Sequence, residues 1–389
     1  MSGAAADGGL LDPGGKVDQD ALRAAVERAG PDDPDARRVV LTLQRDINDR
    51  LDRYLTSRIP FMSRSQIQRL IEDGHAVVNG RTARASTKLR GGDAIDLVLP
   101  PPPSGEIEPE DIPLDVLFED AHIIVLNKRA GIIVHPARSH NRGTMLNALA
   151  WRFRGQGGGA LSPVGTEFAR PGVVHRLDRD TTGCIAFAKT EEAHWKLAAQ
   201  FEKRTTDKRY LAIVHGRVES AVEVIEAPIG PHPSREKGYR EKMVVRHDQL
   251  GKPSVTICRV REVYRLHDRP VGDQWFSLVE LELKTGRTHQ IRVHLSDRGW
   301  PIVGDDMYGG RAFELPGGDA TEAGTIDRQM LHAALLAFEH PITGKTMAPV
   351  APIPGDMNRL LAHLRSGMVE RVNPAHAVPY ARLDLEEGE

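Results

Sequence analysis

The sequence has few cysteines and no long apolar run. Its two cysteines, Cys184 and Cys258, both lie in apolar segments, which excludes a disulfide framework and a cysteine metal knuckle. This usage is typical of a reducing compartment. No apolar run is long enough to cross a bilayer, and the N-terminus lacks the basic-then-apolar order of a secretion signal. We therefore expect a cytoplasmic protein without a membrane partner.

The chain also lacks a strong excess of either charge, because its formal net charge is −2. This total hides a local excess: between residues 37 and 100, 12 Lys and Arg stand against 7 Asp and Glu. Nucleic-acid binding depends on such local patches rather than on the total charge. The near-neutral balance therefore excludes no nucleic-acid partner.

Composition divides the 389 residues, 40% of them hydrophobic, into five segments. Residues 1–36 are rich in Gly, Ala, Asp and Pro and predict a disordered tail. Residues 37–101 form the basic module, and the Pro-rich residues 102–111 predict a linker. Residues 112–365 alternate strands and helices, and residues 366–389 predict a flexible polar tail. The expected fold class is α+β, with a small N-terminal module of two helices and a small sheet before a large mixed-sheet domain.

The basic module predicts two short helices and a tight hairpin. The helices cover residues 49–55 and 63–74, the second with Ser63 as its N-cap. A strand then enters a turn at Asn79-Gly80. Basic side chains on the second helix and the hairpin suit the phosphate backbone of structured RNA, although ordinary solvated arginines explain the charge equally well. The candidate RNA-binding residues here are Arg64, Arg69, Arg81, Arg84 and Lys88.

Four elements of the large domain stand out before any chemistry is considered. Residues 123–128 and 132–136 predict two buried strands around a turn at Gly131. Residues 143–151 predict an amphipathic helix capped by Thr144, and residues 191–201 predict another helix.

The polar turn within residues 171–183 is the chemical centre of the sequence. Val173-Val174 predicts the end of one strand, and residues 184–188 predict a second, buried strand, so the charges between them lie on a turn. We expect Asp178, with Arg176 nearby, to be ionised and able to act as a nucleophile or a base. The alternative is that this carboxylate only caps a turn and pairs with arginine.

Two later stretches add candidate site residues. Tyr210 follows a basic run and begins a strand, where a ring can stack on an extruded base, although a tyrosine at the edge of the core is the commoner explanation. His289 and His294 match no usual zinc spacing, and no Cys or carboxylate completes a set, so we expect no metal.

Three motifs resemble those of the RluA-type family of RNA pseudouridine synthases. They are His175-Arg176-Leu177-Asp178-Arg179-Asp180-Thr181-Thr182-Gly183, Lys208-Arg209-Tyr210-Leu211-Ala212 and Thr285-Gly286-Arg287-Thr288-His289-Gln290-Ile291-Arg292. The first has Thr182 where the family often has serine. The basic module resembles the RNA-binding domain of ribosomal protein S4, at residues 50–55, 63–65, 78–80 and 91–93.

The resemblance implies a cofactor-independent monomer that isomerises uridine to pseudouridine in RNA, specifically in 23S large-subunit ribosomal RNA. It implies that Asp178 is the catalytic nucleophile or base, that Tyr210 stacks on the target uracil and that Arg292 pairs with Asp178. It also implies that Arg176 fills the gap left by the extruded nucleotide. Further RNA contacts are expected from Lys208, Arg209, Arg287 and His289.

Two other functions remain open. One is a non-catalytic RNA-binding or ribosome-assembly factor, against which the intact Asp178, Tyr210 and Arg292 argue. The other is an aspartate-based glycosidase that pairs Asp178 with Asp180 as acid and nucleophile. The RNA-type module has no place in that second function.

Overall fold

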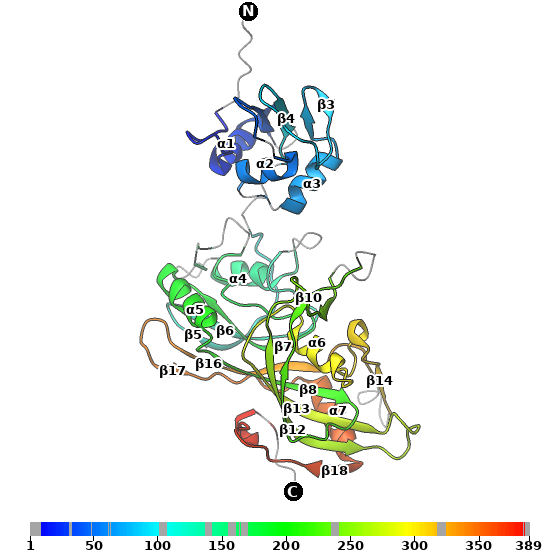
Figure 1. Cartoon of the computed structure of the whole chain (residues 1–389). Helices are drawn as coiled ribbons and strands as arrows, with labels where there is room; N and C mark the ends of the chain where they lie inside the picture. Colours follow the sequence, from blue (N-terminus) through cyan, green and yellow to red (C-terminus); the bar gives the residue numbers. More distant parts are fainter. Residues whose placement is uncertain are drawn as a thin grey trace, which may run out of the picture. The chain divides into compact units, whose positions relative to one another are not determined.

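The chain folds into two units, residues 1–104 and 105–389, each with its own hydrophobic core (Figure 1). The computed structural model describes residues 9–30, 33–47, 49–60, 62, 64–100, 107–136, 142–154, 161–162, 164, 170–234, 241–316, 324–383 and 385. Within these residues, every helix is too short or too polar to cross a membrane. The predicted cap Ser63 lies outside the described residues.

The described residues of the first unit form a four-stranded antiparallel sheet with three helices. In the sheet, β4 lies between β1 and β2, and β3 pairs with β2 at the edge. The predicted turn is confirmed, because Asn79 and Gly80 have φ of 51° and 70°. The elements are α1 (Gln19–Ala29), a 3-10 turn (Asp35–Arg37), β1 (Arg38–Thr42), α2 (Leu51–Arg58), α3 (Arg64–Glu72), β2 (Ala76–Val78), β3 (Arg81–Thr82) and β4 (Ala94–Val98).

The prediction of a disordered tail over residues 1–36 is wrong for its described part. Asp18 caps α1 by accepting hydrogen bonds from the amides of Asp20 and Ala21. Leu10, Val17 and Leu22 are buried in the core of the first unit. These three apolar side chains are enough to order the segment, because it packs on an existing core and does not need a core of its own.

The second unit is built on a ten-stranded mixed sheet. Its order is β18-β12-β13-β8-β16-β7-β6-β5, with β9 on β12 and β17 on β16; β16 and β7 are parallel and the other pairs are antiparallel. The strands are β5 (Asp115–Glu119), β6 (Ile123–Lys128), β7 (Thr182–Ala188), β8 (Asp207–His215), β9 (Val222–Glu226), β12 (Val255–Arg265), β13 (Trp275–Leu283), β16 (Leu331–Glu339), β17 (Thr346–Met347) and β18 (Met368–Arg371).

Helices and two hairpins complete the second unit. Helix α5 packs on β7, and both α6 and α7 pack on β12. The helices are α4 (Met145–Phe153), α5 (Glu191–Lys203), α6 (Gln290–Asp297) and α7 (Gly355–Arg365), with 3-10 turns at Asp306–Tyr308 and Tyr380–Leu383. The hairpins pair β10 (Ile229–Pro231) with β11 (Met243–Val245) and β14 (Phe313–Leu315) with β15 (Gly324–Ile326).

Local predictions in the second unit have mixed outcomes. Thr144 caps α4 in a capping box with Asn147, as predicted. The strand predicted at residues 132–136 is wrong, because only an isolated bridge joins Ile133 to Thr144. Ile132 and Val134 are buried there, so the alternating pattern reports burial of a loop rather than a strand. Val173 likewise forms only an isolated bridge.

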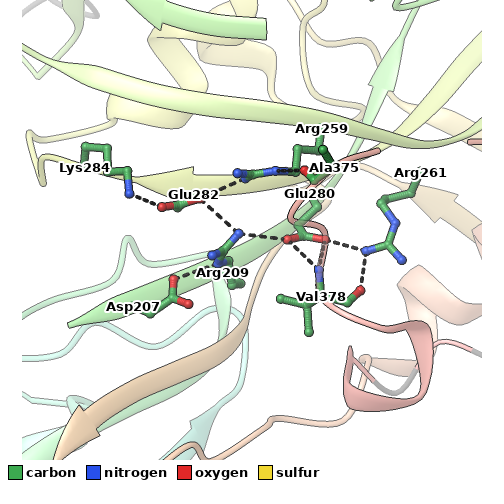
Figure 2. Close-up of polar contacts among 9 residues, drawn as sticks. All are labelled: Asp207, Arg209, Arg259, Arg261, Glu280, Glu282, Lys284, Ala375 and Val378. Carbon is green, nitrogen blue, oxygen red and sulfur yellow. Dashed lines mark hydrogen bonds and ion pairs between the residues drawn. The ribbon is translucent and has the colours of Figure 1, made fainter. Parts of the chain in front are cut away.

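The two predicted segments that flank the large domain are ordered where they are described. Residues 107–111 of the expected linker lie on α4, where Asn147 Nδ2 donates to the Glu108 carbonyl over 2.8 Å. The flexible tail predicted at residues 366–389 is wrong for its described part, since β18 pairs with β12 and Leu383 is buried. The Val378 amide donates to the Glu280 carboxylate, and its carbonyl accepts from Arg261 (Figure 2). The polar composition of this segment conceals the docking, because a few apolar side chains and backbone groups make it.

Candidate active site

The three sequence motifs meet around one cavity of about 450 Å³ in the second unit. Asp178, Tyr210 and Arg292 all line it. They come from the loop before β7, from β8 and from α6, so residues 114 positions apart become neighbours. Four of the expected RNA contacts also line the cavity, and they are Arg176, Lys208, Arg287 and His289.

The loop that carries Asp178 is fixed by a buried lysine at the end of β6. The Lys128 ammonium donates to the carbonyls of Arg129, Arg179 and Thr181 over 2.9, 2.6 and 2.8 Å. Burial lowers the pKa of Lys128 to about 7, although the charges of the nearby aspartates oppose this shift. The sequence does not predict this role. The feature that could have indicated it is a lysine at the end of an apolar strand.

The same loop is held at its start by His175. Its Nε2 accepts a hydrogen bond of 2.9 Å from the Ala186 amide in β7, and its ring stacks on Phe201 with centroids 4.4 Å apart. Burial, assisted by the charge of Lys208, lowers the pKa of His175 to about 3. The imidazole is therefore neutral at neutral pH and serves as an acceptor for β7.

Arg292 contacts Asp178, but its main partner is Asp305. Arg292 Nη1 lies 3.4 Å from Asp178 Oδ2, whereas Nε and Nη2 bind the two oxygens of Asp305 over 2.7 and 2.8 Å. Burial opposes the cation, yet the hydrogen bonds to Asp305 and the charges of both aspartates raise the pKa of Arg292. Arg292 is thus a fixed cation beside Asp178. Sequence reasoning assigns no role to Asp305.

Tyr210 presents a neutral phenol to the cavity. It lies in β8 opposite Leu281 of β13, and only 8% of it is exposed. Burial, followed by the charge of Asp178, raises the pKa of its hydroxyl above the ordinary value. The ring and a protonated hydroxyl are therefore available together near Asp178.

Arg209 contradicts the expectation of an RNA contact. Neighbouring strand residues point to opposite faces, so Arg209 lies on the other side of β8 from Tyr210. Its side chain is 12% exposed and binds Asp207 at 2.7 Å, Glu280 at 3.2 Å and Glu282 at 3.1 Å (Figure 2). This guanidinium holds strands together and does not line the cavity.

Asp180, the second carboxylate that a glycosidase needs, does not line the cavity either. Its Oδ1 accepts a hydrogen bond of 3.1 Å from the Gly131 amide. The two histidines considered as metal ligands have different surroundings. His289 lines the cavity, whereas both ring nitrogens of His294 form hydrogen bonds of 2.9 Å, with Thr256 and with the Ala227 carbonyl. Within the described residues, no three His, Cys, Asp or Glu side chains are grouped as metal ligands.

In the first unit, the buried carboxylate of Asp52 anchors two arginines. It accepts from Arg50, Arg64 and Gln68 over 3.0, 2.9 and 2.9 Å. Burial opposes ionisation, but these hydrogen bonds lower the pKa of Asp52 to about 2. Arg64 therefore has part of its charge compensated. All five candidate residues of this unit are exposed, and they are Arg64, Arg69, Arg81, Arg84 and Lys88.

Known protein families match both parts of the chain described above. The RNA pseudouridylate synthase family profile matches residues 122–297, and the S4 domain profile matches residues 49–95. The chain is 38% identical over 320 residues to the uncharacterized RNA pseudouridine synthase YlyB of Bacillus subtilis (strain 168), covering 82% of this chain and 95% of that protein.

Two relatives carry a more specific name, ribosomal large subunit pseudouridine synthase D. The protein from Xanthomonas campestris is 40% identical over 320 residues, covering 81% of this chain and 89% of the relative. The protein from Escherichia coli (strain K12) is 37% identical over 342 residues, covering 86% and 97%. The chain therefore belongs to the RluA-type family of RNA pseudouridine synthases, isomerases that act on RNA, and its first unit contains an S4 domain.

Proposed function

We propose that this protein converts specific uridines of large-subunit ribosomal RNA into pseudouridine, with Asp178 as the nucleophile or base. The observation that carries this proposal is the placement of Asp178, Tyr210 and Arg292 around one cavity. The names of the relatives support the choice of RNA. The reaction detaches uracil from ribose at nitrogen, turns it and rejoins it through carbon, so it needs no oxidant and no donated group.

In this proposal, the cationic partner of Asp178 sets its chemistry. Arg292 is held by Asp305 and leaves one Nη 3.4 Å from Asp178, so the carboxylate is oriented without being locked in a bidentate pair. A partly exposed carboxylate can attack the ribose, attack the uracil ring or remove a sugar proton. All three routes start from the same placement.

Arg176, Tyr210, Leu177 and Ile291 also line the cavity, and each is given a role in extruding or holding the target nucleotide. Extruding a nucleotide from a stacked helix costs about a few kcal/mol. Arg176 is exposed at the cavity and is proposed to fill the gap left in the stem. Tyr210 is proposed to stack on the extruded uracil and to handle a proton at its carbon, while Leu177 and Ile291 exclude water.

The S4 domain is proposed to add contacts to the RNA backbone through Arg64, Arg69, Arg81, Arg84 and Lys88. These side chains are exposed, and A-form RNA is recognised largely by charge and shape. We propose that residues 37–101 contain the RNA contacts of the first unit, that residues 112–365 contain the catalytic residues, and that the protein is a monomer in the cytoplasm. Light scattering tests the oligomeric state, and a stable dimer would contradict it.

The substitution Asp178→Asn tests the central role. It should abolish pseudouridine formation while leaving RNA affinity largely intact, because it removes the reactive charge and keeps the shape. Asp180→Asn is the matched control on the same loop, since Asp180 does not line the cavity, and it should retain most of the activity. Turnover near the wild-type rate in Asp178→Asn would refute the role. Mapping pseudouridines in a deletion strain against its parent identifies the modified uridines.

A further inference from the structure

Tyr308 joins three parts of the second unit beside the cavity. Its ring lies 4.8 Å from the Arg292 guanidinium. Its hydroxyl oxygen accepts a hydrogen bond of 2.9 Å from the amide of Met243 in β11 and lies 2.8 Å from His289 Nδ1. Ring, hydroxyl and backbone contacts therefore fix Tyr308 with respect to His289.

These contacts favour one of the two positions for the proton of the His289 imidazole. The phenol oxygen already accepts from Met243, so its own proton needs an acceptor, and His289 Nδ1 is the acceptor within reach. Burial raises the pKa of Tyr308 to about 12, so the phenol keeps that proton, and burial lowers the pKa of His289, so the imidazole is neutral. A neutral imidazole that accepts at Nδ1 is protonated at Nε2.

His289 Nε2 faces the Asp178 carboxylate without bonding to it. His289 Nε2 lies 3.9 Å from Asp178 Oδ1, which is too long for a hydrogen bond. His289 lines the cavity, and no hydrogen bond of Nε2 occurs within the described part of the chain. His289 also has φ of 56°, a left-handed conformation that is uncommon for residues other than glycine. His289 Nε2 is thus directed into the cavity and is available to a ligand bound there.

We propose that His289 Nε2–H donates a hydrogen bond to a carbonyl oxygen of the target uracil, and that Tyr308 is the positioning residue that fixes this tautomer. This inference rests on the proposed role of Asp178. When the bond between uracil nitrogen and ribose breaks, negative charge spreads over the carbonyl oxygens of the base. A donor held in place beforehand stabilises that charge more than it stabilises the neutral ground state. No proton is transferred in this step.

Nitrogen NMR of the histidine-labelled protein tests the tautomer without any RNA. We expect His289, assigned by comparison with His289→Gln, to be protonated at Nε2 in the wild type. In Tyr308→Phe, the signal should shift towards a mixture of both tautomers. A wild-type His289 protonated at Nδ1 would overturn the inference.

Single-turnover kinetics test the donor. His289→Ala should slow the chemical step by about 100-fold, with little change in RNA affinity, and His289→Gln, whose amide offers an N–H, should recover part of the rate. Tyr308→Phe should slow the step less, and adding it to His289→Ala should cause no further loss because it acts through His289. Tyr380→Phe is the matched control: Tyr380 also lies under an arginine, at 4.1 Å from Arg261, and should leave the rate unchanged.

RNA with a sulfur atom in place of one uracil oxygen identifies the acceptor. Because sulfur accepts hydrogen bonds poorly, either 2-thiouridine or 4-thiouridine at the target should slow the wild type but not slow His289→Ala further. Equal slowing of both enzymes by both RNAs, or a wild-type rate in His289→Ala, would overturn the inference. If Asp178→Asn were also active, the proposed function itself would fail; if Asp178→Asn were inactive, only the role of His289 would fail.

Discussion

Replacing Asp305 by asparagine should destabilise the second unit and slow catalysis together. Asp305 has a fully buried side chain and binds Arg292 through two hydrogen bonds. Removing one partner of a buried ion pair costs about 3–5 kcal/mol. Asparagine can still accept one of the two bonds, so we expect a loss of about 3 kcal/mol, or roughly 6–12 °C in melting temperature.

The catalytic effect follows from what Arg292 does once Asp305 is neutral. Its nearest remaining carboxylate is Asp178, at 3.4 Å, and the guanidinium should move towards it. A displacement of about 1 Å at a reacting group can cost on the order of 100-fold in rate. We therefore expect Asp305→Asn to lower kcat by roughly 100-fold, measured at a temperature where the variant is folded.

Glu262→Gln separates the two effects. Glu262 is also fully buried and binds an arginine through two hydrogen bonds, from Arg365 Nε and Nη2 over 2.9 and 2.7 Å, but neither residue lines the cavity. This variant should lose similar stability and keep its kcat. If both variants lost stability equally and Asp305→Asn kept its kcat, the argument that Asp305 fixes Arg292 for catalysis would be refuted.

Three further changes test other parts of the chain. Asp52 stabilises the first unit fully above its ordinary pKa of 3.8, and this contribution is lost as the pH falls towards 2; Asp52→Asn should remove that pH dependence in acid unfolding followed by circular dichroism. Ending the chain at residue 372 should lower the melting temperature, because Glu280 loses the Val378 amide; unchanged calorimetry would contradict this. Deleting residues 1–101 should weaken RNA binding and flatten its salt dependence, and an unchanged slope would remove this module from the interface.

The features that the sequence predicts correctly are those set by neighbouring residues. The Asn79-Gly80 turn needs two residues that tolerate positive φ, and the Thr144 cap needs only Asn147 three residues later. Lys128 is missed because its partners include the Thr181 carbonyl 53 positions away. Asp305 is missed for the same reason, since only the fold shows that it holds Arg292.

Arg209 shows how a local rule can correct a motif. The resemblance covers Lys208, Arg209 and Tyr210 together, but successive residues of a strand alternate between faces. Placing Tyr210 at the cavity therefore already places Arg209 on the other face, where the strand partner Glu282 and its neighbour Glu280 neutralise it. When a motif lies on a strand, the alternation of side chains between the two faces should decide which of its residues contact the ligand.

The charged residues that line the cavity are mostly basic, whereas the whole chain has a slightly negative net charge. Five Lys or Arg line the cavity against Asp178 and Glu202, although the formal net charge is −2. Many acidic residues elsewhere are already paired with arginine, as in the cluster of Figure 2. At physiological ionic strength, charges act over about 8 Å. A weak total charge can therefore steer RNA little from a distance, and affinity must depend on short-range contacts that the basic side chains make once the RNA backbone is close to them.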